Sequence, residues 1–227
     1  MNLNDFLVRN QLNISEAAGR ICEQGIEMMR DSIDILHNSN HVYRMFGDLE
    51  HFIRDQPHIR KEINLDVLLM SIVWHDVWRT SRFPFTVRSL LIDRLWEGIG
   101  SGGLFTRMAR NSGLNQNTIK AVSYNIRKHA GVQFWPAKTI ESQVLKDLDQ
   151  LDEWSFERVK PLREKYPNIG VVDFRLVKLA QFYFDHFLIK KNITKFYFQW
   201  SQQEFINRRE VFLNEINRLI AEYTSNI

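Results

Sequence analysis

The sequence predicts an all-α fold, and three observations support this prediction. Apolar residues recur at intervals of three and four through most of the chain, which is the period of a helix rather than of a strand. Strand signals are weak, and no β-hairpin dipeptide stands between two alternating runs. The chain has 227 residues, 44% of them hydrophobic and 25% charged, so it can bury a substantial core. We therefore expect a helical bundle.

Capping residues and prolines mark the ends of the first helices. Ser15 has the side chain of an N-cap for a helix over 15–36. A second helix is expected to begin at 38–40 and to end before Pro57, because the residue ahead of a proline disfavours the helical conformation.

A third helix begins at Asn64 or Asp66 and runs on to Asp76. Further helices are expected at about 86–97, 103–112, 115–130, 137–153, 171–189 and 198–223. The glycine-rich stretch GIGSGG, at 98–103, has neither the preceding strand nor the lysine of a phosphate-binding loop. We interpret it as a flexible connection between two helices.

These elements predict a single domain over 1–227. Its core is expected at about 33–155, with an N-terminal helix at 15–36 and a C-terminal helical extension at about 170–224. The proline-containing loop PLREKYPNIG is the best candidate for the boundary between the core and the extension.

Composition limits the chemistry that the chain can perform. The single cysteine, Cys22, excludes an internal disulfide and a multi-cysteine zinc site, so a metal would need histidine and carboxylate ligands. No apolar run reaches the roughly 18 residues of a membrane span, and the first residues lack the apolar run of a signal peptide. We therefore expect a cytoplasmic protein with no membrane partner.

The net charge is +3, with a sequence isoelectric point near 9.0. This permits anionic partners but is modest for a nucleic-acid-binding protein, and most of it is expected to be a solvated surface. The segment LIKKNITK, which ends at Lys195, is the strongest local basic patch. A helical nucleic-acid-binding protein is therefore the weakest of the alternatives that the sequence leaves open.

Several helices direct a polar group inward from the end of an apolar stripe. The helix before Asp76 carries such a stripe, which leads at helical spacing to His75 and Asp76. Asp149 and His129 follow apolar positions in the same way on later helices. A lone histidine on an apolar face is more often a satisfied core residue than a ligand. A divalent cation, however, would satisfy buried carboxylates and histidines together.

The order of these residues resembles the HD superfamily of metal-dependent phosphohydrolases. That pattern has a histidine at the start of one helix, a His-Asp pair near the end of a second and an aspartate on a later helix. It matches His41, His75, Asp76 and Asp149, so the resemblance implies that these four residues bind metal in an HD-domain helical bundle. HVYRM and KDLDQLDEW are similar to the family's segments around the first histidine and the last aspartate, and the resemblance covers about 33–155.

The stretch LHNSNH is similar to the HNxxH segment of cyclic-nucleotide phosphodiesterases. The resemblance implies that His37 is the proton donor and His41 the metal ligand. A helix-end histidine that contacts backbone carbonyls is an equally good interpretation of His37. His51, His58 and His186 have no matching motif around them, and we expect no site role for them.

The chain also departs from the family pattern. Many relatives have HDxGK after the pair, whereas this chain has HDVWR, with Trp78 in place of the glycine and Arg79 in place of the lysine. Arginine can still bind a phosphate through two hydrogen bonds. Relatives with two metals use extra histidines between the pair and the last aspartate, and only His129 lies in that interval, so we expect one metal ion.

The resemblance implies hydrolysis of a phosphomonoester or phosphodiester, most simply in a small nucleotide. The ion would be Mn, Fe, Co, Ni or Zn, with Mg also permitted. Asp76 would be both ligand and base. Arg79 and Lys128 would offset phosphoryl charge, and His37 or His129 would protonate the leaving oxygen. A homodimer is compatible with the family, although no interface is visible in the residues.

One alternative comes from a different functional class. The altered HDVWR segment favours a catalytically silent HD-fold protein that binds a metal or ligand and acts in regulation. Metal binding without hydrolysis would distinguish that protein from the enzyme.

Overall fold

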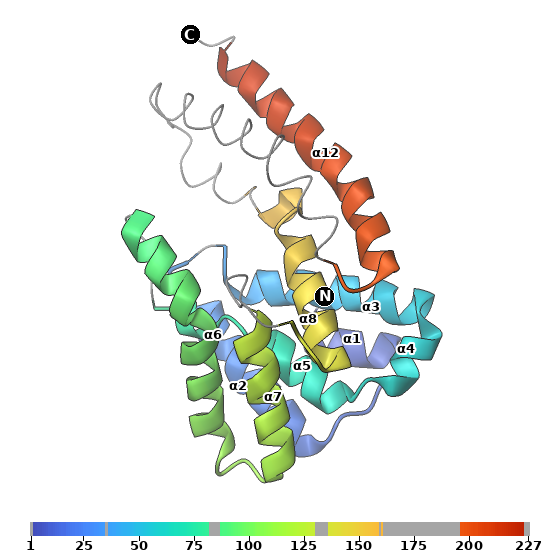
Figure 1. The fold of residues 1–227 in the computed structure, drawn as a ribbon, viewed down its shortest axis with the longest axis vertical. Helices are drawn as coiled ribbons and strands as arrows, with labels where there is room; N and C mark the ends of the chain where they lie inside the picture. Colours follow the sequence, from blue (N-terminus) through green and yellow to red (C-terminus); the bar gives the residue numbers. More distant parts are fainter. Residues whose placement is uncertain are drawn as a thin grey trace. The chain divides into compact units, whose positions relative to one another are not determined.

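The computed structural model describes residues 2–34, 36–81, 87–129, 136–158, 160 and 196–224. The described residues form helices and no strand, which confirms the predicted all-α fold (Figure 1). None of the described helices is both long enough and apolar enough to cross a membrane.

The first half of the chain forms five α-helices and one 3₁₀ helix. They are α1 (Leu3–Arg9), α2 (Glu16–Arg30), α3 (Ser39–Asp55), α4 (Pro57–Glu62), α5 (Leu65–Trp74) and the 3₁₀ helix η1 (Val77–Arg79). The later described helices are α6 (Val87–Ala109), α7 (Gln116–His129), α8 (Ile140–Asp152) and α12 (Gln199–Thr224).

Side-chain caps begin the helices where the sequence predicts them. The Ser15 hydroxyl accepts a hydrogen bond from the backbone N–H of Ala18 at 3.3 Å, and the Asn64 side chain accepts one from Val67 at 3.2 Å. These bonds satisfy N–H groups that have no partner inside the helix. The predicted starts of α2 and α5 are therefore confirmed.

The end predicted for the first capped helix is wrong, because α2 stops at Arg30 rather than near 36. Side chains in the next segment bond the backbone locally. The Asp34 carboxylate accepts from the N–H of Leu36 at 3.0 Å, and the Ser32 hydroxyl accepts from the N–H of Asp34 at 3.2 Å. Such bonds offer the backbone an alternative to the helix. The resulting turn carries Asp34 and His37 into the region of the site.

The predicted flexible connection at 98–103 is also wrong, because α6 runs through it without a break. The glycines permit close packing instead. A β-carbon added at Gly98 would lie 3.1 Å from the carbonyl oxygens of Ile126 and Arg127 on α7, and one added at Gly100 would lie 2.3 Å from the Trp78 ring. Helices α6 and α7 accordingly lie side by side (Figure 1).

The chain divides into two compact units, residues 1–149 and 150–227, with the boundary inside α8. The core predicted at 33–155 spans this boundary. In the first unit, α5 packs against α2 and α7, and α3 packs against α1 and α2. The helix predicted at 171–189, the loop PLREKYPNIG and the basic segment LIKKNITK lie outside the described residues.

The second unit has its own apolar cluster around the end of α8 and α12. Its buried members are Leu151, Trp154, Phe196, Phe205 and Phe212. Buried Asp152 pairs with Arg158 at 3.4 Å, so an aspartate three residues after Asp149 is neutralised within this unit.

Candidate metal centre

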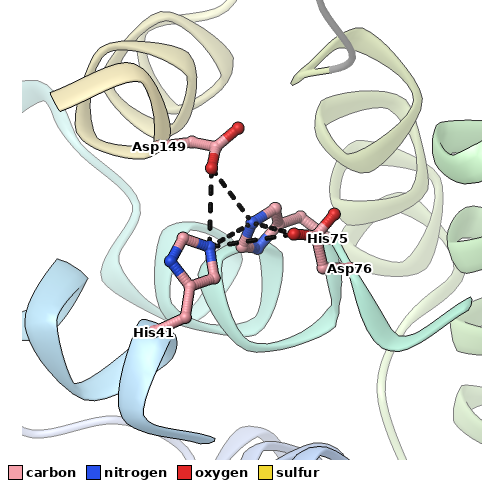
Figure 2. Close-up of side chains that lie close together, drawn as sticks. All are labelled: His41, His75, Asp76 and Asp149. Atoms are coloured by element: carbon pink, nitrogen blue, oxygen red, sulfur yellow. Dashed lines mark hydrogen bonds and ion pairs between the residues drawn. The ribbon is translucent and has the colours of Figure 1, made fainter. Parts of the chain in front are cut away.

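Three helices bring four predicted ligands together in the first unit. His41 is in the first turn of α3, where the Asn38 side chain caps the helix by accepting from the N–H of Asn40 at 3.0 Å. His75 directly follows α5, Asp76 precedes η1, and Asp149 lies on α8. Figure 2 shows the four side chains pointing toward one another. We call His41, His75, Asp76 and Asp149 the four-residue group.

The distances within the four-residue group suit a shared ion. The Nε2 atoms of His41 and His75 are 3.0 Å apart, and Asp149 Oδ1 lies 3.4 Å from the first and 3.6 Å from the second. Asp76 Oδ2 is 3.3 Å from His75 Nε2 and 3.8 Å from His41 Nε2. Donor atoms that each lie about 2.1 Å from one ion are expected about 3.0 to 3.5 Å from each other. The group could therefore hold a metal ion with modest adjustment.

Hydrogen bonding fixes which nitrogen of His75 faces the group. Its Nδ1 lies 2.7 Å from the carbonyl oxygen of Ile72, and a carbonyl only accepts, so Nδ1 carries the proton. In the neutral ring, which is the form that binds a metal, the Nε2 lone pair is then directed at the other members. This is the arrangement that orients histidine ligands in metal sites.

The electrostatics of the group favour positive charge. Burial opposes the imidazolium of His75, but Asp76 and Asp149 raise its pKa well above the usual range. Burial likewise opposes the Asp76 carboxylate, but His75 and the neighbouring histidines lower its pKa well below the usual range. The pKa of Asp149 is also well below the usual range, because hydrogen bonds from His41 and His75 outweigh burial. The carboxylates thus remain ionised and attract a proton or a cation.

A second set of ligand-type side chains lies beside the first. Asp76, Glu97 and His129 are all buried, and they are close enough to hold an ion. We call them the three-residue group. His129 Nε2 is 3.4 Å from Asp76 Oδ1 and 3.9 Å from Glu97 Oε1. Burial, reinforced by the charge of Asp76, raises the pKa of Glu97 to about 6.

Sequence reasoning missed Glu97. The available signal was an acidic residue within the apolar run LWEGIG, directly before the glycines that allow α6 to approach α7. That signal is visible only when the glycines are interpreted as a packing surface rather than as a loop.

His37 is held by a carboxylate that sequence reasoning also missed. Its Nδ1 is 2.8 Å from Asp34 Oδ2, and its Nε2 is 3.7 Å from Asp76 Oδ2. One ring nitrogen therefore faces Asp34 while the other faces the four-residue group. His51 and His58 are exposed, and His186 is outside the described residues.

Arg79 is only 6% exposed, and it joins two carboxylates. One terminal nitrogen lies 3.0 Å from Glu97 Oε2 and the other 3.2 Å from Asp34 Oδ2. A phosphate would have to compete with these two carboxylates for the guanidinium. Lys128, the other predicted phosphate ligand, is half-buried on α7 next to His129.

Comparison of the chain with family models, with curated proteins and with solved structures found no match. The fold and the two ligand groups therefore carry the functional argument.

Proposed function

We propose that the protein is a cytoplasmic metal-dependent phosphohydrolase with an HD-type helical domain, acting on a phosphomonoester or phosphodiester, most simply in a nucleotide. The observation that carries the proposal is the convergence of His41, His75, Asp76 and Asp149 from three separate segments. The donor atoms that face one another are separated by 3.0 to 3.8 Å. The order of these residues along the chain is the order in which the HD superfamily supplies its ligands.

The donor set indicates the class of metal. Two imidazole nitrogens and two carboxylate oxygens suit Mn, Fe, Co, Ni or Zn better than Ca, and Mg is permitted. Such an ion lowers the pKa of a bound water and polarises a phosphoryl oxygen. Asp149 keeps 20% of its side chain exposed, so the group is open to solvent at this member.

The surrounding residues can take the acid and base roles. Asp34 holds His37 through Nδ1 and directs its Nε2 toward the four-residue group, where it can protonate a leaving oxygen. Asp76 stays ionised and can accept a proton from the attacking water. Lys128, beside His129, is assigned to the phosphoryl oxygens, and Arg79 is assigned to orienting Asp34 and Glu97.

One observation favours the alternative of a catalytically silent regulatory protein. The arginine that replaces the family's lysine is already paired with Asp34 and Glu97. A site that has lost a phosphate-binding cation could keep its metal without turnover.

The test is metal content by mass spectrometry, together with hydrolysis of a panel of nucleotides and phosphodiesters, on protein freed of any histidine tag. Asp149→Asn removes one ligand charge with little change in shape, and the exposed Asp31→Asn is its control. We expect near-stoichiometric metal and hydrolysis in the wild type and the control, and loss of both in Asp149→Asn. Metal without hydrolysis would support the silent alternative. Wild-type protein that takes up no manganese or zinc would overturn both.

A further inference from the structure

The stretch between Glu97 and Glu141 contains no acidic residue, although it holds several basic ones. With 27 acidic residues among 227, a stretch of this length would be expected to contain about five. The whole chain carries a net charge of only +3, so the rest of the protein is net acidic. Positive charge is therefore concentrated in the part of the chain that begins within α6 and includes α7. Its basic residues are Arg107, Arg110, Lys120, Arg127, Lys128 and Lys138.

One side of α6 is exposed and combines apolar with basic side chains. Trp96 and Ile99 are 55% and 47% exposed, and they lie at helical spacing with the exposed Arg107 and Arg110. Glu97, which belongs to the three-residue group, is buried. The exposed side of α6 is therefore distinct from the metal centre.

Helix α7 extends this surface. The exposed Lys120 and Arg127 lie two helical turns apart and so share one side of α7. The side chain of Arg127 reaches α6, because a β-carbon added at Gly102 would lie 3.1 Å from its Cγ and 3.2 Å from its Nε. Since α6 and α7 lie side by side, their exposed side chains form one surface (Figure 1). The residues that we call the basic face are Trp96, Ile99, Arg107, Arg110, Lys120 and Arg127.

The charge of the basic face indicates an anionic partner. Within the described parts of the chain, no carboxylate pairs with its four cations. A symmetric contact with a second copy would oppose the face to itself, so its cations would repel one another.

The apolar residues of the basic face distinguish between the anionic partners. The phosphates of a nucleic acid would match the cations but would leave Trp96 and Ile99 without an apolar partner. An anionic bilayer matches both kinds of side chain. Its headgroups attract Lys and Arg, while Trp and aliphatic side chains enter the boundary between the headgroups and the acyl chains.

We propose that the basic face binds the surface of a membrane that contains anionic lipids. The sequence predicted no membrane partner, because no apolar run is long enough to span a bilayer, but contact with a bilayer surface needs no such run. The membrane contact goes beyond the proposed hydrolysis and does not depend on a bound metal.

The test is co-sedimentation with vesicles of phosphatidylcholine, alone or mixed with phosphatidylserine, in chelator and at increasing salt. We expect wild-type protein to bind only the mixed vesicles, with an affinity that falls as salt is added. Arg107→Glu combined with Lys120→Glu should weaken binding by at least about 25-fold, since each basic residue near an anionic surface contributes about fivefold. Trp96→Gln leaves the charge unchanged and should weaken binding by about 10-fold.

The matched control is Arg9→Glu combined with Lys61→Glu, which changes the net charge equally at exposed positions outside the basic face. It should bind nearly as the wild type does, with folding of each variant checked by circular dichroism. Wild-type protein that ignores the mixed vesicles would overturn the membrane contact, as would equal weakening by the two charge-reversed pairs. Binding to DNA or RNA without binding to vesicles, lost when Arg107 and Lys120 are reversed, would assign the face to nucleic acid instead. The metal-dependent function is tested separately, by metal content.

Discussion

The four-residue and three-residue groups share Asp76 but are assembled by different means. The four-residue group is built from helix ends, with His41 in the first turn of α3 and His75 just after α5. The three-residue group depends on how closely α6 and α7 pack, because Glu97 and His129 come from these two helices. Helix ends leave short local patterns in a sequence, whereas a helix-to-helix separation does not. The comparison therefore separates the part of the site that a sequence encodes locally from the part that requires tertiary packing.

Removing the shared residue should produce the largest effect. Asp76→Asn keeps the shape of the side chain but removes the charge that serves both groups, so we expect loss of bound metal. Hydrolysis of any substrate found in the panel should fall by at least about 1,000-fold, as it does when a catalytic group is removed. Asp149→Asn should act on the four-residue group first. A variant of Asp76 that retained a tightly bound ion would show that this carboxylate is not a required ligand.

Arg79 links the three-residue group to the segment that holds His37. Arg79→Met retains most of the volume of the side chain. It removes the positive charge that pairs with the buried carboxylates of Asp34 and Glu97. Removing one partner of a buried ion pair costs about 3 to 5 kcal/mol. We expect a loss of this size in the free energy of unfolding, measured with denaturant in a chelator.

Arg107→Met is the control for this variant, because Arg107 is exposed on α6 and its replacement should change stability by no more than about 0.5 kcal/mol. Equal stability of the two variants would show that the Arg79 contacts contribute little. The phosphate-binding role predicted for Arg79 would then regain support.

The glycines of α6 allow the packing on which the three-residue group depends. A methyl group at Gly100 would overlap the ring of Trp78, whereas one at Gly103 would meet no atom within 4 Å. Gly100→Ala should therefore destabilise the protein by about 1 to 3 kcal/mol, as overpacking does. Gly103→Ala should stabilise it by about 0.5 to 1 kcal/mol, because alanine is the better helix former.

The same pair of variants tests whether packing affects metal binding. We expect Gly100→Ala to weaken Mn²⁺ binding, because Trp78 lies in η1, which directly follows Asp76. An unchanged Mn²⁺ affinity would contradict a link between the packing of the glycines and the metal centre.

Sequence reasoning predicted the all-α fold and the four side chains that the structure brings together. Local signals predicted the helices, namely caps at Ser15 and Asn64, and polar residues at the ends of apolar stripes indicated His75, Asp76 and Asp149. His41 was predicted from the resemblance to the HD superfamily.

Sequence reasoning gave the wrong end for α2, because that end depends on side-chain contacts that form only in the folded protein. Asp34 bonds the backbone and stops α2 early, and that turn then pairs Asp34 with His37 and Arg79.

The second wrong prediction was the flexible connection at 98–103, which followed from its glycines. In the sequence, GIGSGG has the composition of a loop, and only the neighbouring α7 explains why a continuous helix would contain so many residues of low helix propensity. Once the helix was divided in the prediction, Glu97 stood at the end of one piece, with no reason to face His129.

The metal-free protein should also show a dependence of stability on pH. Burial opposes the charged forms of His75 and His129, but nearby carboxylates raise both pKa values above the usual 6.5. The native state then holds more protons than the unfolded state above pH 6.5. The stabilisation that these extra protons give the native state is fully present below pH 6.5. It is lost as the pH rises through the raised pKa values of His75 and His129. Glu97, with its pKa raised to about 6, acts with the same sign.

We therefore expect the free energy of unfolding in chelator to fall between pH 6.5 and 8.5, by up to about 1.4 kcal/mol per pH unit for each extra proton held. Asp76, whose pKa is lowered, stays ionised in both states across this range and adds no slope. A metal bound by the four-residue group replaces the proton of His75, so the slope should be smaller in Mn²⁺. A slope that is unchanged by Mn²⁺ would show that protons and metal do not compete for these side chains.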